Sequence, residues 1–388
     1  MAVGDRADQA NELPQSFLTK DAFRELFGVL AACGYTIVGP RVDQEAIVYG
    51  ELESPDDLPI GWTDEQAPGE YRLKKREDEK TFGFAVGPHS WKQFLFPPQS
   101  RLLTANKEDG TWQFTNNDEP PPRYAFLGVR ACELAAIHVQ DRVFMGDNYV
   151  DPIYAARRTG ALLIAVNCTE AAPTCFCTSM NTGPRCSGGY DLVLTELDDG
   201  YVLEAGTQVG AEILSELETT TATETHLASA ETARQEAIDQ IERRFNTDDI
   251  RDLLLNNLDH HQWDDVAERC LSCTNCTMVC PTCFCSSVEQ VSDLTVEEVE
   301  HQRVWDSCFN FDFSYMHGGG IRGTIRSRYR QWLTHKLGSW IDQFGTSGCV
   351  GCGRCITWCP VGIDLTQEVD AIRKSPKEPT GPQPDETL

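Results

Sequence analysis

The sequence is poor in positive charge and has no long hydrophobic run. Its 388 residues include 33 Lys and Arg against 60 Asp and Glu, which gives a formal net charge of -27. This balance disfavours nucleic acid and anionic membrane surfaces as partners. The longest clean apolar run, Ala161 to Val166, is far too short to span a bilayer. Met1 to Gln15 is polar and contains no apolar signal core, so we expect a cytoplasmic protein without membrane insertion.

Several common catalytic motifs are also missing. The sequence has no P-loop, no nucleophile elbow and no H-E-x-x-H. Gly318, Gly320 and Gly323 satisfy G-x-G-x-x-G, but no apolar strand precedes them, so we interpret this segment as a flexible turn. No hydride-transfer or hydrolytic site is therefore predicted from local motifs.

Cysteine, in contrast, is abundant. Seventeen cysteines are many for a chain without a secretion signal. A reducing compartment makes a disulfide framework implausible. The cysteines therefore indicate metal binding.

The N-terminal half alternates helix and strand signals. Ser16 to Cys33 predicts an amphipathic helix with Thr19 as its N-cap and Gly34 as its stop. The strand Tyr124 to Val129, the helix Glu133 to Met145 and the strand Ala161 to Asn167 predict a parallel βαβ unit. Further strands are expected in five other segments: Tyr35 to Val38, Ala46 to Tyr49, Thr81 to Val86, and the hairpin of Tyr190 to Glu196 with Tyr201 to Ala205.

These patterns predict an α+β fold. The expected parts are an N-terminal α/β domain (1–218) with the parallel βαβ unit, a linker and helices (219–262), a helical ferredoxin-like dicluster domain (263–373) and a disordered tail (374–388). The linker prediction rests on the low-complexity segment Thr219 to Thr225.

Two cysteine runs in the C-terminal part share one spacing, C-x2-C-x2-C-x3-C-P. This spacing is typical of two-cluster ferredoxins, in which the fourth cysteine of each run ligates the cluster of the other run. One [4Fe-4S] cluster is assigned to Cys270, Cys273, Cys276 and Cys359, and the other to Cys349, Cys352, Cys355 and Cys280. Structural zinc seldom uses this triple followed by proline, so the spacing favours iron and sulfur.

The segment between the runs has two unusual features. It contains Cys283, Cys285 and Cys308, which either bind a further cluster with another ligand or pack beside the predicted ones. It also contains a basic island, Phe313 to Ile341, which has no acidic residue and includes Arg322, Arg326, Arg328, Arg330 and Lys336. These arginines either neutralise nearby anionic groups or dock a partner subunit.

A third cluster is predicted in the N-terminal half. Cys132 and Cys168 each follow one strand of the βαβ unit, so both thiols emerge at the carboxyl ends of parallel strands. The next loop adds Cys175 and Cys177, which completes four thiols and leaves Cys186 unused. The alternatives are a four-thiolate zinc site and a group of buried reduced cysteines.

The chain resembles a known family at several short motifs. It resembles the iron–sulfur β subunits of cytoplasmic sulfhydrogenases, which are NiFe hydrogenases that couple H2 to NAD(P), and is similar to one of the subunits of anaerobic sulfite reductase. Glu133 after Cys132 departs mildly from the Cys-Asp expected there. The matching segments are Gly128-Val129-Arg130-Ala131-Cys132-Glu133, Asp141-Arg142-Val143-Phe144, Asn167-Cys168, Cys175-Phe176-Cys177, Trp305-Asp306-Ser307-Cys308 and the two cysteine runs.

The resemblance implies a non-catalytic electron-transfer subunit of an oxidoreductase complex. Its partners would be the small and large subunits of a NiFe hydrogenase and a flavoprotein NAD(P)H-oxidoreductase subunit. Two alternatives stay open: an electron-transfer subunit of a complex of the anaerobic sulfite reductase type, and a catalytic sulfur-reducing subunit that uses Cys132, Cys168 or Cys186. The sequence does not distinguish H2 from sulfite or sulfur as the terminal chemistry, nor NAD from NADP.

Overall fold

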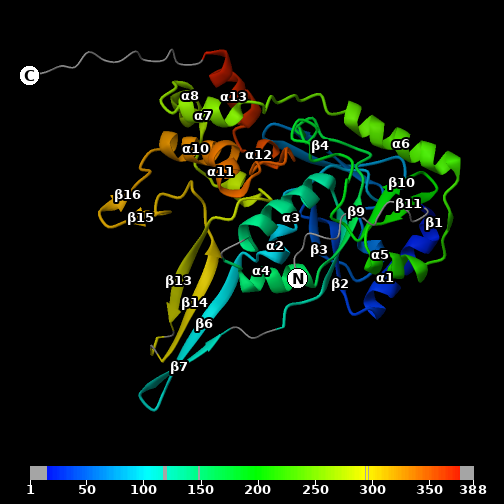
Figure 1. Cartoon of the computed structure of the whole chain (residues 1–388), viewed down its shortest axis with the longest axis horizontal. Helices are drawn as coiled ribbons and strands as arrows, with labels where there is room; N and C mark the ends of the chain where they lie inside the picture. Colours follow the sequence, from blue (N-terminus) through cyan, green and yellow to red (C-terminus); the bar gives the residue numbers. More distant parts are fainter. Residues whose placement is uncertain (1–14, 117–119, 147–148, 293, 296, 376–388) are drawn as a thin grey trace, which may run out of the picture.

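The computed structural model describes residues 15–116, 120–146, 149–292, 294–295 and 297–375. A large mixed sheet with its helices forms one part, and a cluster of short helices formed by the C-terminal residues forms another (Figure 1). The predicted α+β fold is confirmed. The predicted disordered tail lies almost entirely outside the described residues.

The main sheet has eight strands in the order β12-β1-β11-β10-β9-β8-β2-β3. Their bounds are β1 (Ser16–Thr19), β2 (Thr36–Asp43), β3 (Ala46–Glu51), β8 (Tyr124–Val129), β9 (Leu162–Val166), β10 (Leu192–Glu196), β11 (Gly200–Ala205) and β12 (Thr220–Thr221). β9 runs parallel to both β8 and β10, and β8 runs parallel to β2. The predicted parallel βαβ unit is therefore confirmed.

Helices cover both faces of this sheet. They are α1 (Lys20–Ala32), α2 (Lys92–Leu95), α3 (Ala131–Phe144), α4 (Pro152–Thr159), α5 (Gln208–Ser215) and α6 (Glu224–Asp239). In β9, Ile164 packs into the same core as the α1 side chains, whereas Leu163 packs into the core that contains the α3 side chains. Because successive strand residues point to opposite faces, β9 is buried on both sides.

Helix α1 has the predicted N-cap, but Ser16–Thr19, which was included in the predicted helix, forms β1. Thr19 is the N-cap, and its side chain accepts a hydrogen bond from the backbone N–H of Ala22 at 3.2 Å. Gly34, just after the helix, has a φ of +78°, a conformation that favours glycine. The buried residues of the helix include Phe23 and Leu26, so its apolar face is core.

A second sheet projects from the molecule as a long arm (Figure 1). It has the order β13-β14-β6-β7, with β6 (Gln99–Glu108), β7 (Thr111–Asn116), β13 (Ser286–Ser292) and β14 (Glu298–Trp305). β14 pairs antiparallel with β6, so the insert between the cysteine runs joins a segment from the N-terminal half. This sheet was not predicted. Two short pairs, β4 (Trp62–Ala67) with β5 (Glu70–Lys75) and β15 (Tyr315–Met316) with β16 (Gly319–Gly320), complete the strands of the described residues.

The C-terminal helices pack around one apolar core. Their bounds are α7 (Ile250–Asn256), α8 (Gln262–Arg269), α9 (Asn275–Met278), α10 (Ile325–Thr334), α11 (Trp340–Phe344), α12 (Arg354–Thr357) and α13 (Leu365–Lys374). A π-helical turn, His335–Ser339, joins α10 to α11. Buried Trp263, Leu333 and Val369 lie in this core. Among the described residues no helix combines the length and the apolar character needed to cross a membrane.

Two local predictions were wrong. Thr81 to Val86 is not a strand, because the backbone N–H groups of Thr81 and Phe82 donate instead to the buried carboxylate of Glu196, at 2.6 and 2.8 Å. Thr219 to Thr225 is not a simple linker, since Thr220 and Thr221 pair with β1 and Thr223 caps α6.

Candidate iron–sulfur site

The two C-terminal cysteine runs adopt the same backbone shape. In the first run Ser272 and Thr274 have φ values of +51° and +70°, and in the second Gly351 and Gly353 have +65° and +76°. The N–H of Ser272 donates to Cys270 Sγ at 3.4 Å, and the N–H of Gly351 donates to Cys349 Sγ at 3.5 Å. In each loop a backbone N–H thus donates to the sulfur of the first cysteine of the run, a hydrogen bond that would stabilise a thiolate ligand.

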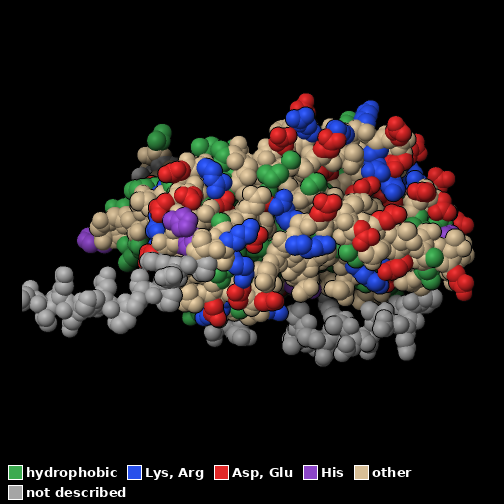
Figure 2. All heavy atoms as spheres, turned by 90° about the horizontal axis from the view of Figure 1, so that it is seen from above, with side chains coloured by type: hydrophobic (Ala, Val, Ile, Leu, Met, Phe, Trp, Pro, Cys, Tyr) green, Lys and Arg blue, Asp and Glu red, His purple; other side chains and the backbone are tan. Residues whose placement is uncertain are grey.

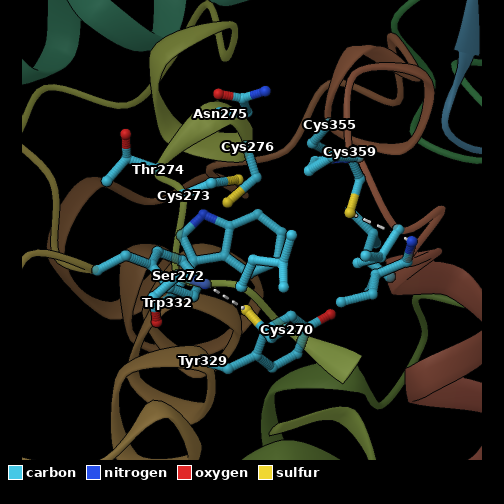
Figure 3. A pocket seen from close by; sticks show the side chains of 16 residues that line it. Cys270, Ser272, Cys273, Thr274, Asn275, Cys276, Tyr329, Trp332, Cys355 and Cys359 are labelled. Atoms are coloured by element: carbon cyan, nitrogen blue, oxygen red, sulfur yellow. Dashed lines mark hydrogen bonds between the residues drawn. The ribbon is translucent and has the colours of Figure 1, made fainter. Parts of the chain in front are cut away.

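Each run brings its fourth cysteine to the other run. Cys270, Cys273, Cys276 and Cys359 line one pocket together with Cys355 of the second run, and Figure 3 shows their side chains around a common space. Burial raises the pKa of Cys276 well above its usual value, and the thiols of Cys270, Cys273 and Cys359 raise it further. We call these four residues the first thiol set.

The second thiol set is Cys349, Cys352, Cys355 and Cys280. Burial is the main cause that raises the pKa of Cys355, and the other three thiols of the set raise it further. The Cys276 thiol of the first set also raises the pKa of Cys355, so the first and second sets are neighbours. Both groupings match the predicted exchange of fourth ligands, although the ligand assignment itself stays a prediction.

The N-terminal thiols also lie together. Cys132 occupies the first turn of α3, directly after β8, and Cys168 follows β9. Burial raises the pKa of Cys175 to about 12, with a smaller contribution from Cys168. Burial raises the pKa of Cys177, and the thiols of Cys175 and Cys168 raise it further. Burial raises the pKa of Cys132 well above its usual value, and the thiols of Cys352 and Cys177 raise it further. We call Cys132, Cys168, Cys175 and Cys177 the third thiol set.

The third set lies against the second. The N–H of Phe176 donates to the carbonyl oxygen of Gly351 at 2.8 Å. A Cβ added to Gly351 would lie 2.7 Å from Cys177 Cα, so only glycine allows the two loops to pack this closely. Cys352 of the second set also raises the pKa of Cys132. The three sets therefore form a continuous row: first, second, third.

Cys186 lies near one thiol of the third set, because burial raises its pKa and the Cys168 thiol raises it further. The Cys186 N–H donates to Asn167 Oδ1 at 2.8 Å, and its thiol donates to the carbonyl oxygen of Val166 at 3.8 Å. The Cys186 thiol therefore forms its hydrogen bond with the end of strand β9. The exclusion of Cys186 from the predicted ligands stays a prediction.

The donor chemistry fits iron–sulfur clusters. Every residue of the three sets is a cysteine without a disulfide partner. Buried thiols that carry several neighbouring thiols have raised pKa values and need a cation to bind as thiolates. For the part of the chain that the structure describes, no group of three His, Cys, Asp or Glu side chains is arranged to hold a single metal ion.

A buried ion pair, which sequence analysis did not identify, connects the second and third sets. Glu133 and Arg354 are both about 1% exposed and pair with each other. Glu133 Oε2 also accepts hydrogen bonds from the Tyr49 hydroxyl at 2.8 Å and from Trp91 Nε1 at 3.0 Å. Since Glu133 follows Cys132 and Arg354 lies between Cys352 and Cys355, this pair fixes α3 against the second cysteine run.

Lys336 places a buried positive charge beside the second set. Its Nζ donates to Cys280 Sγ at 3.2 Å and to Thr282 Oγ1 and the Gly348 carbonyl oxygen at 3.1 Å. Burial alone would lower the pKa of Lys336, but the thiolates of Cys280 and Cys283 raise it well above its usual value. The residue lies in the π-helical turn, a feature that is frequent at functional sites.

Replacing Lys336 with Met should lower the reduction potential of the cluster bound by Cys280, on the order of tens of mV. The substitution removes a positive charge and an N–H···S hydrogen bond, both of which favour the reduced, more negative cluster. A redox titration followed by electron paramagnetic resonance (EPR) would measure the shift. Lys74→Met is the control, because Lys74 is exposed and pairs with Glu65 rather than with a ligand sulfur. An unchanged potential in Lys336→Met, or an equal shift in both variants, would contradict this role.

The basic island is largely used within the chain. Arg326 pairs with Asp264 at 2.8 Å, and Arg330 pairs with Asp259 at 3.9 Å. Arg328 is buried and donates to the Arg322 carbonyl oxygen at 3.1 Å. These contacts favour the first interpretation, in which the arginines neutralise nearby groups. Elsewhere the surface shows acidic and basic side chains interspersed over the face drawn in Figure 2.

Comparison with known proteins supports the site. Residues 269–363, which contain both cysteine runs, match the family described as the 4Fe-4S dicluster domain. The chain is 27% identical over 362 residues to sulfhydrogenase 2 subunit beta of Pyrococcus furiosus, and the match covers 92% of this chain and 98% of that protein. No solved structure matches the chain. The resemblance inferred from the motifs is thus confirmed: the chain carries a 4Fe-4S dicluster domain and is similar along nearly its whole length to a sulfhydrogenase beta subunit.

Proposed function

We propose that this chain is the electron-transfer iron–sulfur subunit of a cytoplasmic sulfhydrogenase-type complex. It relays electrons between a NiFe hydrogenase pair of small and large subunits and a flavoprotein subunit that handles NAD(P)H. The observation that carries the proposal is the continuous row of three thiol sets. Each set would hold one [4Fe-4S] cluster, which supplies one-electron redox chemistry when bound.

One end of the row reaches the surface. Cys273, in the first set, is exposed, so a partner could exchange electrons there. Cys132 and Cys177, in the third set, are buried. The protein itself would hold neighbouring clusters close together, orient their ligands and keep water away from the middle of the row.

The charges around the row favour electron storage in its middle. Lys336 donates directly to Cys280, and Arg354 lies between Cys352 and Cys355. Glu133 compensates the charge of Arg354, whereas Lys336 is buried and donates to a ligand sulfur, so its attraction for an anionic cluster is only weakly screened. Lys336 would raise the potential of the second cluster relative to one without such a neighbour.

Affinity purification of the tagged chain from its host under anaerobic conditions tests the proposal. We expect it to bring down three further subunits in equal amounts, namely the small and large subunits of a hydrogenase and a flavoprotein. Mass spectrometry, nickel analysis and flavin fluorescence would identify them. A chain that is monomeric in native lysate, or that is accompanied by a sirohaem-type sulfite reductase instead, would contradict it.

A further inference from the structure

Three cysteines outside the row form a further group. The segment Pro173 to Ser179 recurs at Pro281 to Ser287 with a single change, Thr178 to Ser286. The first copy supplies Cys175 and Cys177 to the third set. The second copy carries Cys283 and Cys285, which belong to none of the three thiol sets.

Both copies dock on the second cysteine run. In the first, the N–H of Phe176 donates to the Gly351 carbonyl oxygen. In the second, the hydroxyl of Thr282 donates to the Gly348 carbonyl oxygen. Thr174 and Thr282, which occupy the same place in the two copies, are both fully buried. The two Cys-Phe-Cys turns therefore flank the same loop in related ways.

The projecting sheet brings a third thiol to the second copy. Cys285 directly precedes β13, and β14 ends at Trp305, which lies opposite Ser286. The N–H of Asp306 donates to the Cys285 carbonyl oxygen at 2.8 Å, so the chain returns to this point shortly before Cys308. Cys283, Cys285 and Cys308 line one cavity of about 280 Å³. This volume is close to the ~300 Å³ at the lower end of small-ligand sites.

Positive charge surrounds this cavity. Lys92 and Lys336 are 4% and 3% exposed. Lys92 Nζ lies 3.1 Å from the Cys283 carbonyl oxygen and 3.9 Å from the centre of the Trp305 ring, and Lys336 lines the cavity. Among the described residues neither lysine forms an ion pair with a carboxylate. Lys336 also donates to Cys280 Sγ, whereas Lys92 Nζ donates to backbone carbonyl oxygens. Because a buried ammonium without an anion is costly, an anionic group at the three thiols would supply a partner for Lys92.

We propose that Cys283, Cys285 and Cys308 bind a fourth [4Fe-4S] cluster, with the fourth iron left to a ligand other than cysteine. The thiolates supply three ligands, and the two lysines neutralise the anionic cluster. The site adjoins Cys280, whose thiol contacts Cys283, and therefore the middle of the row. The proposal goes beyond the three-cluster relay and does not depend on the identity of the partner subunits.

Iron analysis of matched variants in the intact complex tests this site. The complex is purified anaerobically with the wild-type chain, with Cys283→Ala/Cys285→Ala and with Cys33→Ala, an exposed cysteine outside every set. We expect the double variant to contain about four iron atoms fewer per complex than the wild type, and Cys33→Ala to equal the wild type. An unchanged iron content in the double variant overturns the proposal. Cys175→Ala/Cys177→Ala, in the equivalent turn, tests the third cluster separately from the fourth. Iron loss in the Cys283→Ala/Cys285→Ala variant alone would leave the three-cluster relay intact.

A second measurement uses only the wild-type complex. Cys285 and Cys308 are half-buried and line an open cavity, so an alkylating reagent can reach them unless iron covers their sulfurs. We expect mass spectrometry to find Cys33 alkylated in the native complex, and Cys285 and Cys308 alkylated only after iron is removed with a chelator. Alkylation of Cys285 and Cys308 in the iron-replete complex would overturn the proposal even if the double variant failed to fold.

Discussion

Replacing Cys175 and Cys177 with alanine should remove about four iron atoms from the anaerobically purified protein. Both thiols belong to the third set, and each lies close enough to Cys168 to be affected by its charge. Removing two of four ligands leaves no stable cubane, so the loss should be complete at this site. Iron analysis gives the number, and EPR of the reduced protein should lose one cluster signal while the others persist.

Cys186→Ala is the matched control for this experiment. Cys186 is buried and lies near Cys168, but its thiol donates to the Val166 carbonyl oxygen. We expect its replacement to leave the iron content unchanged. Iron loss in Cys186→Ala together with full iron in Cys175→Ala/Cys177→Ala would show that the third set is composed of different residues.

The second large effect is expected on stability. Glu133→Ala leaves Arg354 buried without its carboxylate and also removes the acceptor of Tyr49 and Trp91. Breaking a buried ion pair by removing one partner costs about 3–5 kcal/mol in the free energy of unfolding. Anaerobic urea unfolding followed by tryptophan fluorescence would show the shift of the midpoint.

Asp56→Ala provides the comparison for Glu133→Ala. Asp56 pairs with Arg24 at 2.7 Å, but their side chains are 75% and 45% exposed. An exposed pair of this kind contributes at most about 1 kcal/mol. A loss of similar size in both variants would contradict a special structural role for the buried pair between α3 and the second cysteine run.

Hydrophobic patterns in the sequence predicted two kinds of element. One kind has a buried and a solvent-facing side, and the other is buried on both sides. The strands β8 and β9, the helix α1 and the hairpin of β10 and β11 all have apolar runs of the right period, bounded by turn residues. The cysteine runs were recognisable because ligand spacing is a local property of the chain. Parallel strands also placed Cys132 and Cys168 on one edge without any knowledge of the tertiary structure.

The remaining features depend on contacts between distant segments. β13 has Ser286, Glu289 and Gln290 among few apolar residues, and its partner β14 pairs with β6 from nearly two hundred residues away, so neither strand carries a clear core pattern. The pairing of Glu133 with Arg354 spans 221 positions and needs both cysteine loops in place. Thr81 to Val86 has the composition of a strand, yet the carboxylate of Glu196 takes its backbone donors. No local rule predicts such contacts.

The central claim is that electrons pass through the thiol sets of this chain from one partner to another. Cys273→Ala in the assembled complex tests it most directly, because Cys273 is the exposed ligand of the first set and its replacement disturbs the core least. With loss of the first cluster verified by EPR, we predict that H2-dependent reduction of NAD(P) falls to background. Hydrogen oxidation with an artificial dye and NAD(P)H oxidation with a dye should both persist. Coupled activity that continues at the wild-type rate after loss of this cluster would contradict the account.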